Sequence, residues 1–164
     1  MAHHDSSAGG PELHPGRLVE LDVEDVDVHG DGVARAPGGL VVFVQGALAG
    51  EKVLARVVER RRHYARARLE RVLAAWEGRV PAPCPVADRC GGCPLMVMAY
   101  DRQLAHKRRL VEESLLRLGQ LEAERVRVLP TLGMDHPWRY RNRAQYPVAR
   151  GADGRVVLGF FRRG

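Results

Sequence analysis

Residues 17–35 have the sequence RLVELDVEDVDVHGDGVAR. In the first half of this stretch, apolar residues such as Val19 and Leu21 alternate with acidic ones. An alternation with a period of two predicts a strand that has one face in water. The second half contains two closely spaced glycines, which predict a tight turn because glycine tolerates positive φ. A second, short strand is expected at residues 33–35.

Three more segments of strand length follow, separated by glycine-containing loops. They are predicted at residues 40–44, 53–58 and 64–70. Five short strands in succession favour a small closed barrel of the OB type, although an SH3-like barrel would have much the same pattern. The last strand alternates small or apolar residues with charged ones, so its exposed face is expected to be basic. We assign residues 14–75 to the barrel and residues 1–13 to a flexible tail.

Length and composition fit one ordinary domain or two small ones. The chain has 164 residues, of which 45% are apolar, enough for a packed core. No apolar run approaches the roughly 18 residues of a membrane span, and residues 1–16 lack the features of a signal peptide. We therefore expect a cytoplasmic protein without a membrane partner, and a monomer. In that compartment, three cysteines within ten residues indicate metal binding or catalysis rather than disulfides.

The net charge of +6 is unevenly distributed. Residues 1–50 contain two Arg against eight Asp/Glu, residues 51–75 contain eight Lys/Arg against three Glu, and residues 137–164 contain seven Arg against one Asp. Two separated basic blocks suit a polyanionic partner such as structured RNA, because arginine makes bidentate phosphate contacts. The alternative is a solvated arginine-rich surface. In the first block the candidate RNA-binding residues are Arg61, Arg66 and Arg68.

The second half of the chain predicts a mixed α and β region. Residues 76–96 are rich in Pro, Cys and Gly and are expected to form an irregular loop. From residue 100 to residue 118 apolar residues recur at helical spacing, and Gly119 is expected to cap this helix at its C-terminus. A short strand is expected at residues 125–129.

Two further strands are expected at residues 138–149 and 156–161, joined by a hairpin turn at residues 151–154. The fold class is therefore mainly β with an α+β second part, in which residues 97–164 begin a domain. Because the last predicted strand still needs a partner, we expect this domain to be incomplete.

The three cysteines lie in the segment PCPVADRCGGCPL at residues 83–95. Cys84, Cys90 and Cys93 have the spacing C-x5-C-x2-C, and the glycines between the last two allow backbone N–H groups to turn toward sulfur. A tetrahedral zinc site and a cubane cluster each need four ligands. A fourth cysteine beyond the end of the sequence would serve either site, so the spacing leaves zinc and iron–sulfur both open. The histidines that could complete a zinc site are His63, His106 and His136.

The segment WRYRNRAQY at residues 138–146 interleaves aromatic side chains with basic and amide ones. On a strand Arg139, Arg141 and Arg143 would share one face, and Gln145 would continue that face. A row of guanidiniums can follow a phosphate backbone, and an amide can contact a base edge. We therefore expect RNA contact from these four residues. The aromatic residues expected in the core instead are Trp138 and Tyr140.

No catalytic residue is assigned in this chain. The cysteines lie too close together for a lone nucleophile, and no strand–GxGxxG–helix unit is present. The glycines near residue 31 are therefore interpreted as turn residues.

Five motifs in order along the chain resemble the 23S rRNA/tRNA uracil-5-methyltransferases that carry a 4Fe–4S cluster. The resemblance runs from about Arg17 to Arg163. The motifs are GDGVAR (30–35), VVFVQGALAGE (41–51), the cysteine segment, YDRQLAHKRRLVEESLLRLG (100–119) and PWRYRNRAQ (137–145).

This resemblance implies a TRAM domain, an OB-like RNA-binding barrel, at residues 14–75, followed by a central domain that holds the cluster. It implies ligation of the cluster by Cys84, Cys90 and Cys93, and RNA contact at Arg141, Arg143 and Gln145. In the family a further Rossmann-like domain binds S-adenosylmethionine and supplies a cysteine that attacks C6 of a flipped-out uracil.

Two departures from the family pattern qualify the expected function. The fourth cluster cysteine normally follows a stretch whose beginning resembles residues 159–164, and the methyltransferase domain is missing. We therefore expect the RNA-binding N-terminal part of an S-adenosylmethionine-dependent RNA (uracil-5-)-methyltransferase acting on 23S rRNA, which by itself neither binds S-adenosylmethionine nor methylates. The alternatives are a stand-alone RNA-binding module with a zinc or iron–sulfur knuckle, and a redox protein.

Overall fold

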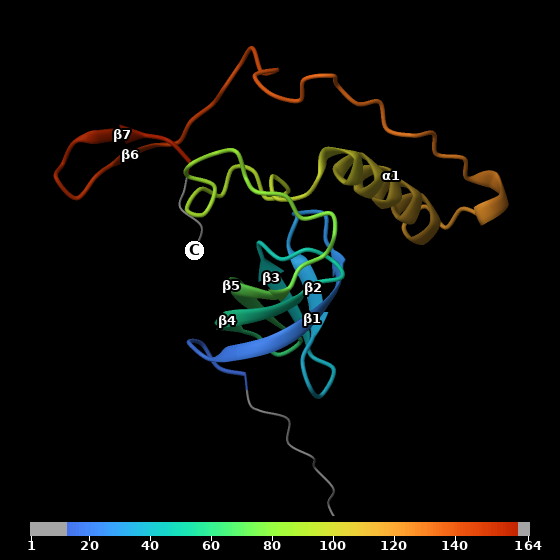
Figure 1. Cartoon of the computed structure of the whole chain (residues 1–164), viewed down its shortest axis with the longest axis horizontal. Coiled ribbons are helices and arrows are strands. Elements are labelled where there is room, and N and C mark those ends of the chain that lie inside the picture. Colours follow the sequence, from blue (N-terminus) through green and yellow to red (C-terminus); the bar gives the residue numbers. More distant parts are fainter. Residues whose placement is uncertain (1–12, 161–164) are drawn as a thin grey trace, which may run out of the picture. The chain divides into compact units, whose positions relative to one another are not determined.

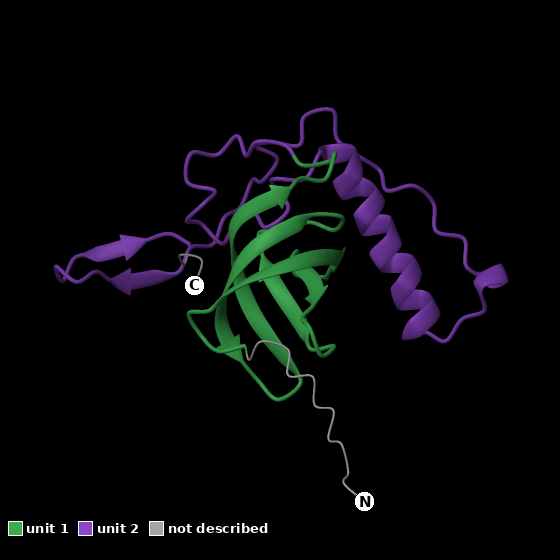
Figure 2. Ribbon diagram, turned by 60° about the horizontal axis from the view of Figure 1, so that its bottom comes forward, with its two compact units in different colours: residues 1–79 green, residues 80–164 purple. Residues whose placement is uncertain are grey.

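The computed structural model describes residues 13–160. The chain separates into two compact units, residues 1–79 and residues 80–164, which Figure 2 colours green and purple. Residues 1–12 of the predicted tail, and the end of the predicted last strand, lie outside the described residues. None of the described helices is both long and apolar enough to cross a membrane.

The first unit is a closed five-stranded barrel with the strand order β1-β2-β3-β5-β4 (Figure 1). Each pair of neighbouring strands is antiparallel except β3 and β5, which run parallel. This order is the five-stranded Greek-key arrangement of an OB-type barrel, so the predicted barrel is confirmed and its topology is resolved. The strands are β1 (Leu18–Val26), β2 (Gly32–Arg35), β3 (Val41–Gln45), β4 (Lys52–Arg60) and β5 (Tyr64–Ala74).

The barrel interior is filled by valines and alanines that alternate with outward-facing residues along each strand. A bulge between Val23 and Asp25 shifts the register of β1, which lets Val26 be buried as well. The sequence predicts a tail up to residue 13, whereas Leu13 is buried in this core. The other members of the core cluster are Val19, Leu21, Val23, Ala34, Ala36, Val42, Val44, Ala47, Val53, Ala55, Val57, Ala65 and Ala67.

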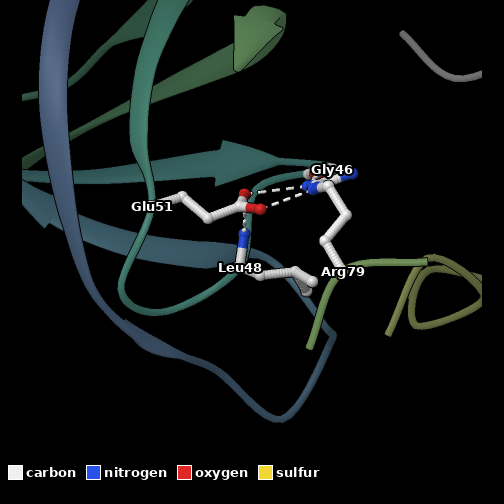
Figure 3. Close-up of polar contacts among 4 residues, drawn as sticks. All are labelled: Gly46, Leu48, Glu51 and Arg79. Atoms are coloured by element: carbon white, nitrogen blue, oxygen red, sulfur yellow. Dashed lines mark hydrogen bonds and ion pairs between the residues drawn. The ribbon is translucent and has the colours of Figure 1, made fainter. Parts of the chain in front are cut away.

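One buried ion pair joins the loop between β3 and β4 to the end of the first unit (Figure 3). The side chain of Glu51 is fully buried, and that of Arg79 is 19% exposed. Arg79 donates through Nε and Nη2 to the two carboxylate oxygens of Glu51, and Nη2 also donates to the Gly46 carbonyl at 2.8 Å. The Leu48 N–H donates to the same carboxylate at 2.9 Å. The charge is thus removed from water together with its partners, as a buried carboxylate requires.

The second unit contains α1 (Tyr100–Arg117), a 3-10 helix (Ala123–Arg125) and a two-stranded hairpin of β6 (Val148–Arg150) and β7 (Val156–Leu158). The predicted helix and the predicted hairpin turn are confirmed. In the turn the Gly151 N–H donates to the Arg155 carbonyl, and Gly154 has a φ of 76°.

Three predictions in the second unit are wrong. Residues 125–129 do not form a strand, since Arg125 ends the 3-10 helix and the residues after it have no regular structure, and regular β structure in the segment 138–149 is limited to its last two residues. Alternating residues are not enough to form a strand, because the backbone N–H and C=O groups of a strand must also pair with a neighbouring strand. Among the described residues, these segments have no such neighbour. At the end of α1 the left-handed position is taken by Gln120, with a φ of 51°, and not by Gly119.

Candidate nucleic-acid interface

The outer face of the barrel carries a row of side chains that crosses four strands. The strand register aligns Val33 of β2 with Phe43 of β3, Phe43 with Arg66 of β5, and Arg66 with Glu59 of β4. The neighbours of Phe43 along β3 are buried, so its own ring points out of the barrel. The same alternation places Tyr64 outside, one step along β5 from Arg66 on that face.

Phe43, Tyr64 and Arg66 form a compact cluster on this face, which we call the aromatic cluster. The two rings pack edge to face, with centroids 5.8 Å apart and an interplanar angle of 74°. The Arg66 guanidinium carbon lies 5.9 Å from the Phe43 centroid and 5.8 Å from the Tyr64 centroid. Such an arrangement holds a planar cation against π faces, and the Arg66 side chain remains 50% exposed.

Acidic residues offset the positive charge of this face. Arg66 lies 3.9 Å from carboxylate oxygens of both Asp31 and Glu59, and Arg61 donates to Glu59 at 2.6 Å. Arg68 lies 3.6 Å from Glu70. All three arginines selected from the sequence in this block therefore have acidic neighbours, and the predicted basic face is locally almost neutral.

Glu70 is shared by two arginines from neighbouring strands. Arg56 of β4 donates to its carboxylate at 2.8 Å, and Arg68 lies nearby. The hydrogen bond from Arg56, together with the two positive charges, holds the pKa of Glu70 below its usual range. The carboxylate is therefore charged near neutral pH and lowers the positive potential over β4 and β5. The arginines near this face without an acidic partner in residues 13–160 are Arg60, Arg62 and Arg71.

The second basic segment differs in conformation and in charge. Residues 138–147 have no regular secondary structure, and Arg139 has a φ of 57°, so the three arginines do not share a strand face. Arg141, Arg143 and Gln145, with Ala144, nevertheless line one shallow hollow of about 510 Å³. Arg139 is not among the residues that line it.

The arginines of this segment are accessible to a ligand. Arg139, Arg141 and Arg143 are exposed, and within the described part of the chain none of them pairs with a carboxylate. Arg141 lies 5.9 Å over the ring of Tyr140. The prediction that the aromatics are core residues is wrong, because Trp138 is 54% exposed and Tyr140 is 58% exposed.

The three cysteines lie in the loop of residues 80–97, which a hydrogen bond from the Val80 N–H to the Val97 carbonyl closes at 2.8 Å. None of them forms a disulfide. The Gly92 N–H donates to Cys90 Sγ at 3.4 Å, the type of contact that stabilises a thiolate. The thiols thus fit a soft metal or a cluster in their chemistry.

The three thiols differ in how exposed they are. Cys84 and Cys90 are half-buried, and Cys93 is exposed. Among residues 13–160 no three side chains of His, Cys, Asp or Glu are gathered closely enough to hold a metal ion. The histidines considered for zinc, His63, His106 and His136, are therefore not brought to the cysteines as a ligand group.

Comparison with known proteins connects this architecture to a family. The model of the TRAM domain matches residues 12–69. An uncharacterized RNA methyltransferase of Halalkalibacterium halodurans is 43% identical over 145 residues, which is 88% of this chain and 31% of that protein. The chain thus contains a TRAM domain at residues 12–69 and is similar, over most of its own length, to proteins named RNA methyltransferases.

A second relative matches this chain to a similar extent. An uncharacterized RNA methyltransferase of Listeria innocua is 41% identical over 151 residues, which is 92% of this chain and 32% of that protein. The chain thus spans about a third of the length of the relatives it matches. A solution structure of a conserved protein from Methanococcus maripaludis is 30% identical, covers 43% of this chain and all of its own, and has a TM-score of 0.35.

Sequence reasoning did not select two residues that the TRAM barrel places in a candidate site. Phe43 and Tyr64 were assigned to strands without a role, and only the register between β3 and β5 brings them together beside Arg66. A signal was available in the alternation, since Ala65 and Ala67 are the inward residues of β5 and Tyr64 must then point outward. Sequence gives no such signal for the parallel pairing with β3.

Proposed function

We propose that this chain is the RNA-binding part of an S-adenosylmethionine-dependent RNA (uracil-5-)-methyltransferase that acts on 23S rRNA. The observation that carries the proposal is the segment of Arg141, Arg143 and Gln145, which presents two arginines without acidic partners in the described residues and one amide around a single hollow. The TRAM match and the relatives named RNA methyltransferases support it. No residue of this chain is assigned to the methyl donor.

The two arginines would bind RNA phosphates, because a guanidinium presents a planar fork of donors that fits phosphate oxygens. Gln145 beside them would contact a base edge. Each phosphate neutralised releases counterions, so the affinity falls as salt is added. The chain is expected to bind a structured RNA with a clear dependence of log Kd on log salt concentration.

Fluorescence anisotropy with a labelled ribosomal RNA hairpin over a series of salt concentrations tests this proposal. Substituting Arg141→Gln and Arg143→Gln together should reduce the salt slope by roughly 0.7 to 0.9 for each phosphate that the variant no longer neutralises. The matched control is Arg155→Gln in the turn of the hairpin, since its side chain is 86% exposed and lies outside the hollow. A salt slope that is flat in the wild type, or equal in the double variant and the wild type, contradicts the proposal.

Methylation at C5 of uracil in 23S rRNA belongs to the same proposal and has its own test. Nucleoside mass spectrometry of 23S rRNA from cells of the source organism with and without the gene should show a 5-methyluridine that is lost on deletion and returns on complementation. Unchanged 5-methyluridine in the deletion strain, or its loss from tRNA alone, contradicts the choice of modification or of RNA.

We propose further that Cys84, Cys90 and Cys93 supply three thiolates to a 4Fe–4S cluster. The support is the soft donor set in a proline- and glycine-rich loop and the N–H contact to Cys90 Sγ. A bound cluster would supply iron–thiolate bonds that hold the loop in one conformation. Binding requires the three thiols to come closer together, so the loop is expected to become more ordered when the cluster forms.

Anaerobic reconstitution with iron and sulfide tests the cluster. The expected result is a brown protein with broad visible absorption, which is lost in the Cys84→Ser, Cys90→Ser and Cys93→Ser variants. A control with Ser114→Ala, on the exposed side of α1, should leave the absorption unchanged. Colourless material that retains stoichiometric zinc after purification contradicts the proposal and favours the zinc site.

A further inference from the structure

We propose that the aromatic cluster of Phe43, Tyr64 and Arg66 is a binding site for a single unpaired RNA base. The inference rests on the proposed function, because it assumes that the chain meets RNA, and it adds the class of ligand that the barrel itself recognises. The site is on the outer face of β3 and β5 and shares no residue with the hollow that Arg141 and Arg143 line.

The geometry provides flat apolar surface that is held in place. Both aromatic residues lie on strands of a closed barrel, where neighbouring residues are buried on the inner face. The edge-to-face packing at 74° means that the two rings present surfaces in different directions. A base can stack on such a surface because every base has a π face, and rigid strands lose little entropy when it binds.

The charges of the cluster favour a base over a phosphate. Arg66 already has two carboxylate oxygens at 3.9 Å, one from Asp31 and one from Glu59. A phosphate approaching Arg66 would be repelled by these carboxylates, whereas a neutral base would not. The guanidinium is planar, is half-exposed and is held beside both rings, so it can extend the stacking surface.

A site that stacks on a base face selects unpaired RNA. In a duplex both faces of each base are covered by its neighbours, and stacking on a protein ring requires the base to leave the helix. The aromatic cluster is therefore expected to bind a loop, a bulge or a single strand, and to contribute nothing to duplex binding. Because it neutralises no phosphate, its contribution is expected to be independent of salt.

Anisotropy measurements with the full chain test these two properties together. The probes are a single-stranded RNA of about ten nucleotides, within the range of one OB barrel, and a blunt duplex of the same sequence. Phe43→Leu and Tyr64→Leu should each weaken single-strand binding by about tenfold, by the same factor at low and at high salt, and leave duplex binding unchanged. Circular dichroism and thermal unfolding confirm that each variant is folded.

Two conservative variants keep the test valid if a leucine variant fails to fold. Tyr64→Phe preserves the ring and should bind the single strand as the wild type does. Arg66→Lys preserves the charge but removes the planar group, so it should weaken single-strand binding at an unchanged salt slope. Equal losses on single strand and duplex, a changed salt slope in the leucine variants, or wild-type affinity in Arg66→Lys would overturn the inference.

The result also separates this inference from the proposed function. If the wild type binds RNA with the expected salt slope and the Phe43→Leu and Tyr64→Leu variants bind single strands equally well, the aromatic cluster is not a base site and the RNA-binding function stands. If the wild type binds neither probe, the proposed function fails and the base site fails with it.

Discussion

Substituting Arg79→Ala should destabilise the barrel more than the loss of any surface ion pair. The substitution leaves the fully buried carboxylate of Glu51 with the Leu48 N–H as its remaining hydrogen-bond donor, and it removes the Nη2 donor to the Gly46 carbonyl. A carboxylate taken out of water without a countercharge is unfavourable, because the loss of hydration is no longer offset by the attraction of the cation.

The expected loss in the free energy of unfolding is about 3 kcal/mol. Removing one partner of a buried pair costs about 3 to 5 kcal/mol, and we take the lower end because Arg79 is 19% exposed and water can reach the space it leaves. For a unit of this size, a loss of about 3 kcal/mol corresponds to a decrease in Tm of at least about 12 °C.

Urea unfolding followed by tryptophan fluorescence measures this loss. The ring of Trp76 lies against Gly50 and Gly78 in the same unit, so its emission reports on the barrel. A Trp138→Phe background removes the only other tryptophan, which is in the second unit. The matched control is Arg35→Ala, because Arg35 forms an exposed ion pair with Glu24 in the same unit, worth about 1 kcal/mol or less.

A loss below about 1 kcal/mol in Arg79→Ala would refute the reasoning, since that is the value of an ordinary surface pair. The double substitution Glu51→Leu with Arg79→Leu gives a second check. Because it removes both charges, it should be considerably more stable than Arg79→Ala. If the double variant is the less stable of the two, the burial of an unpaired charge is not the cause of the effect.

Three further predictions concern the barrel. Gly78→Ala should lower the free energy of unfolding by about 1 to 3 kcal/mol, because a Cβ there would lie 2.3 Å from the Trp76 ring, whereas Gly159→Ala, where a Cβ meets nothing within 4 Å, should leave thermal unfolding unchanged. Leu13→Ala should cost about 2 to 3 kcal/mol in urea unfolding, since Leu13 is a member of the buried core, and a value near zero would place it outside that core. Because the pKa of Glu70 is lowered in the folded state, its contribution to stability is fully present above the usual carboxyl pKa and is lost as the pH falls through the lowered value. The difference in urea midpoint between the wild type and Glu70→Gln should therefore be constant from pH 7 to about pH 5 and shrink as the pH falls below about 4, and a difference that does not shrink with falling pH would contradict the assignment.

The barrel was predictable from the sequence because each of its strands carries its own signal. A period of two in β1 and a continuous apolar run in β3 depend only on neighbouring residues, and the strands are observed within a few residues of the predicted positions. The parallel pairing of β3 with β5 was not predictable, because it is set by closure of the whole sheet. The pair of Glu51 and Arg79 is separated by 28 residues and likewise leaves no local pattern.

The second unit shows where local patterns fail. The helix was predicted because its spacing is sustained over five turns, whereas the alternation in residues 138–146 resembles a strand but has no hydrogen-bonded neighbour among the described residues. The exposed Trp138 and Tyr140 follow from the same error, since a strand would have placed them on a buried face. Arg141, Arg143 and Gln145 still line one hollow, although the segment has no regular structure.

The two basic blocks differ in whether their arginines have acidic partners. This difference determines which part of RNA each block can contact. The block at residues 51–75 has the excess of positive charge in the sequence, yet Glu59, Glu70 and Asp31 lie beside its selected arginines, and its outer face also carries Phe43 and Tyr64. Such a face suits uncharged bases. The arginines at 139–143 have no acidic partner among residues 13–160 and suit phosphates. Since only phosphate contacts release counterions, the part of the salt dependence that Arg141 and Arg143 contribute should report on the second block, and the preference for single strands on the first.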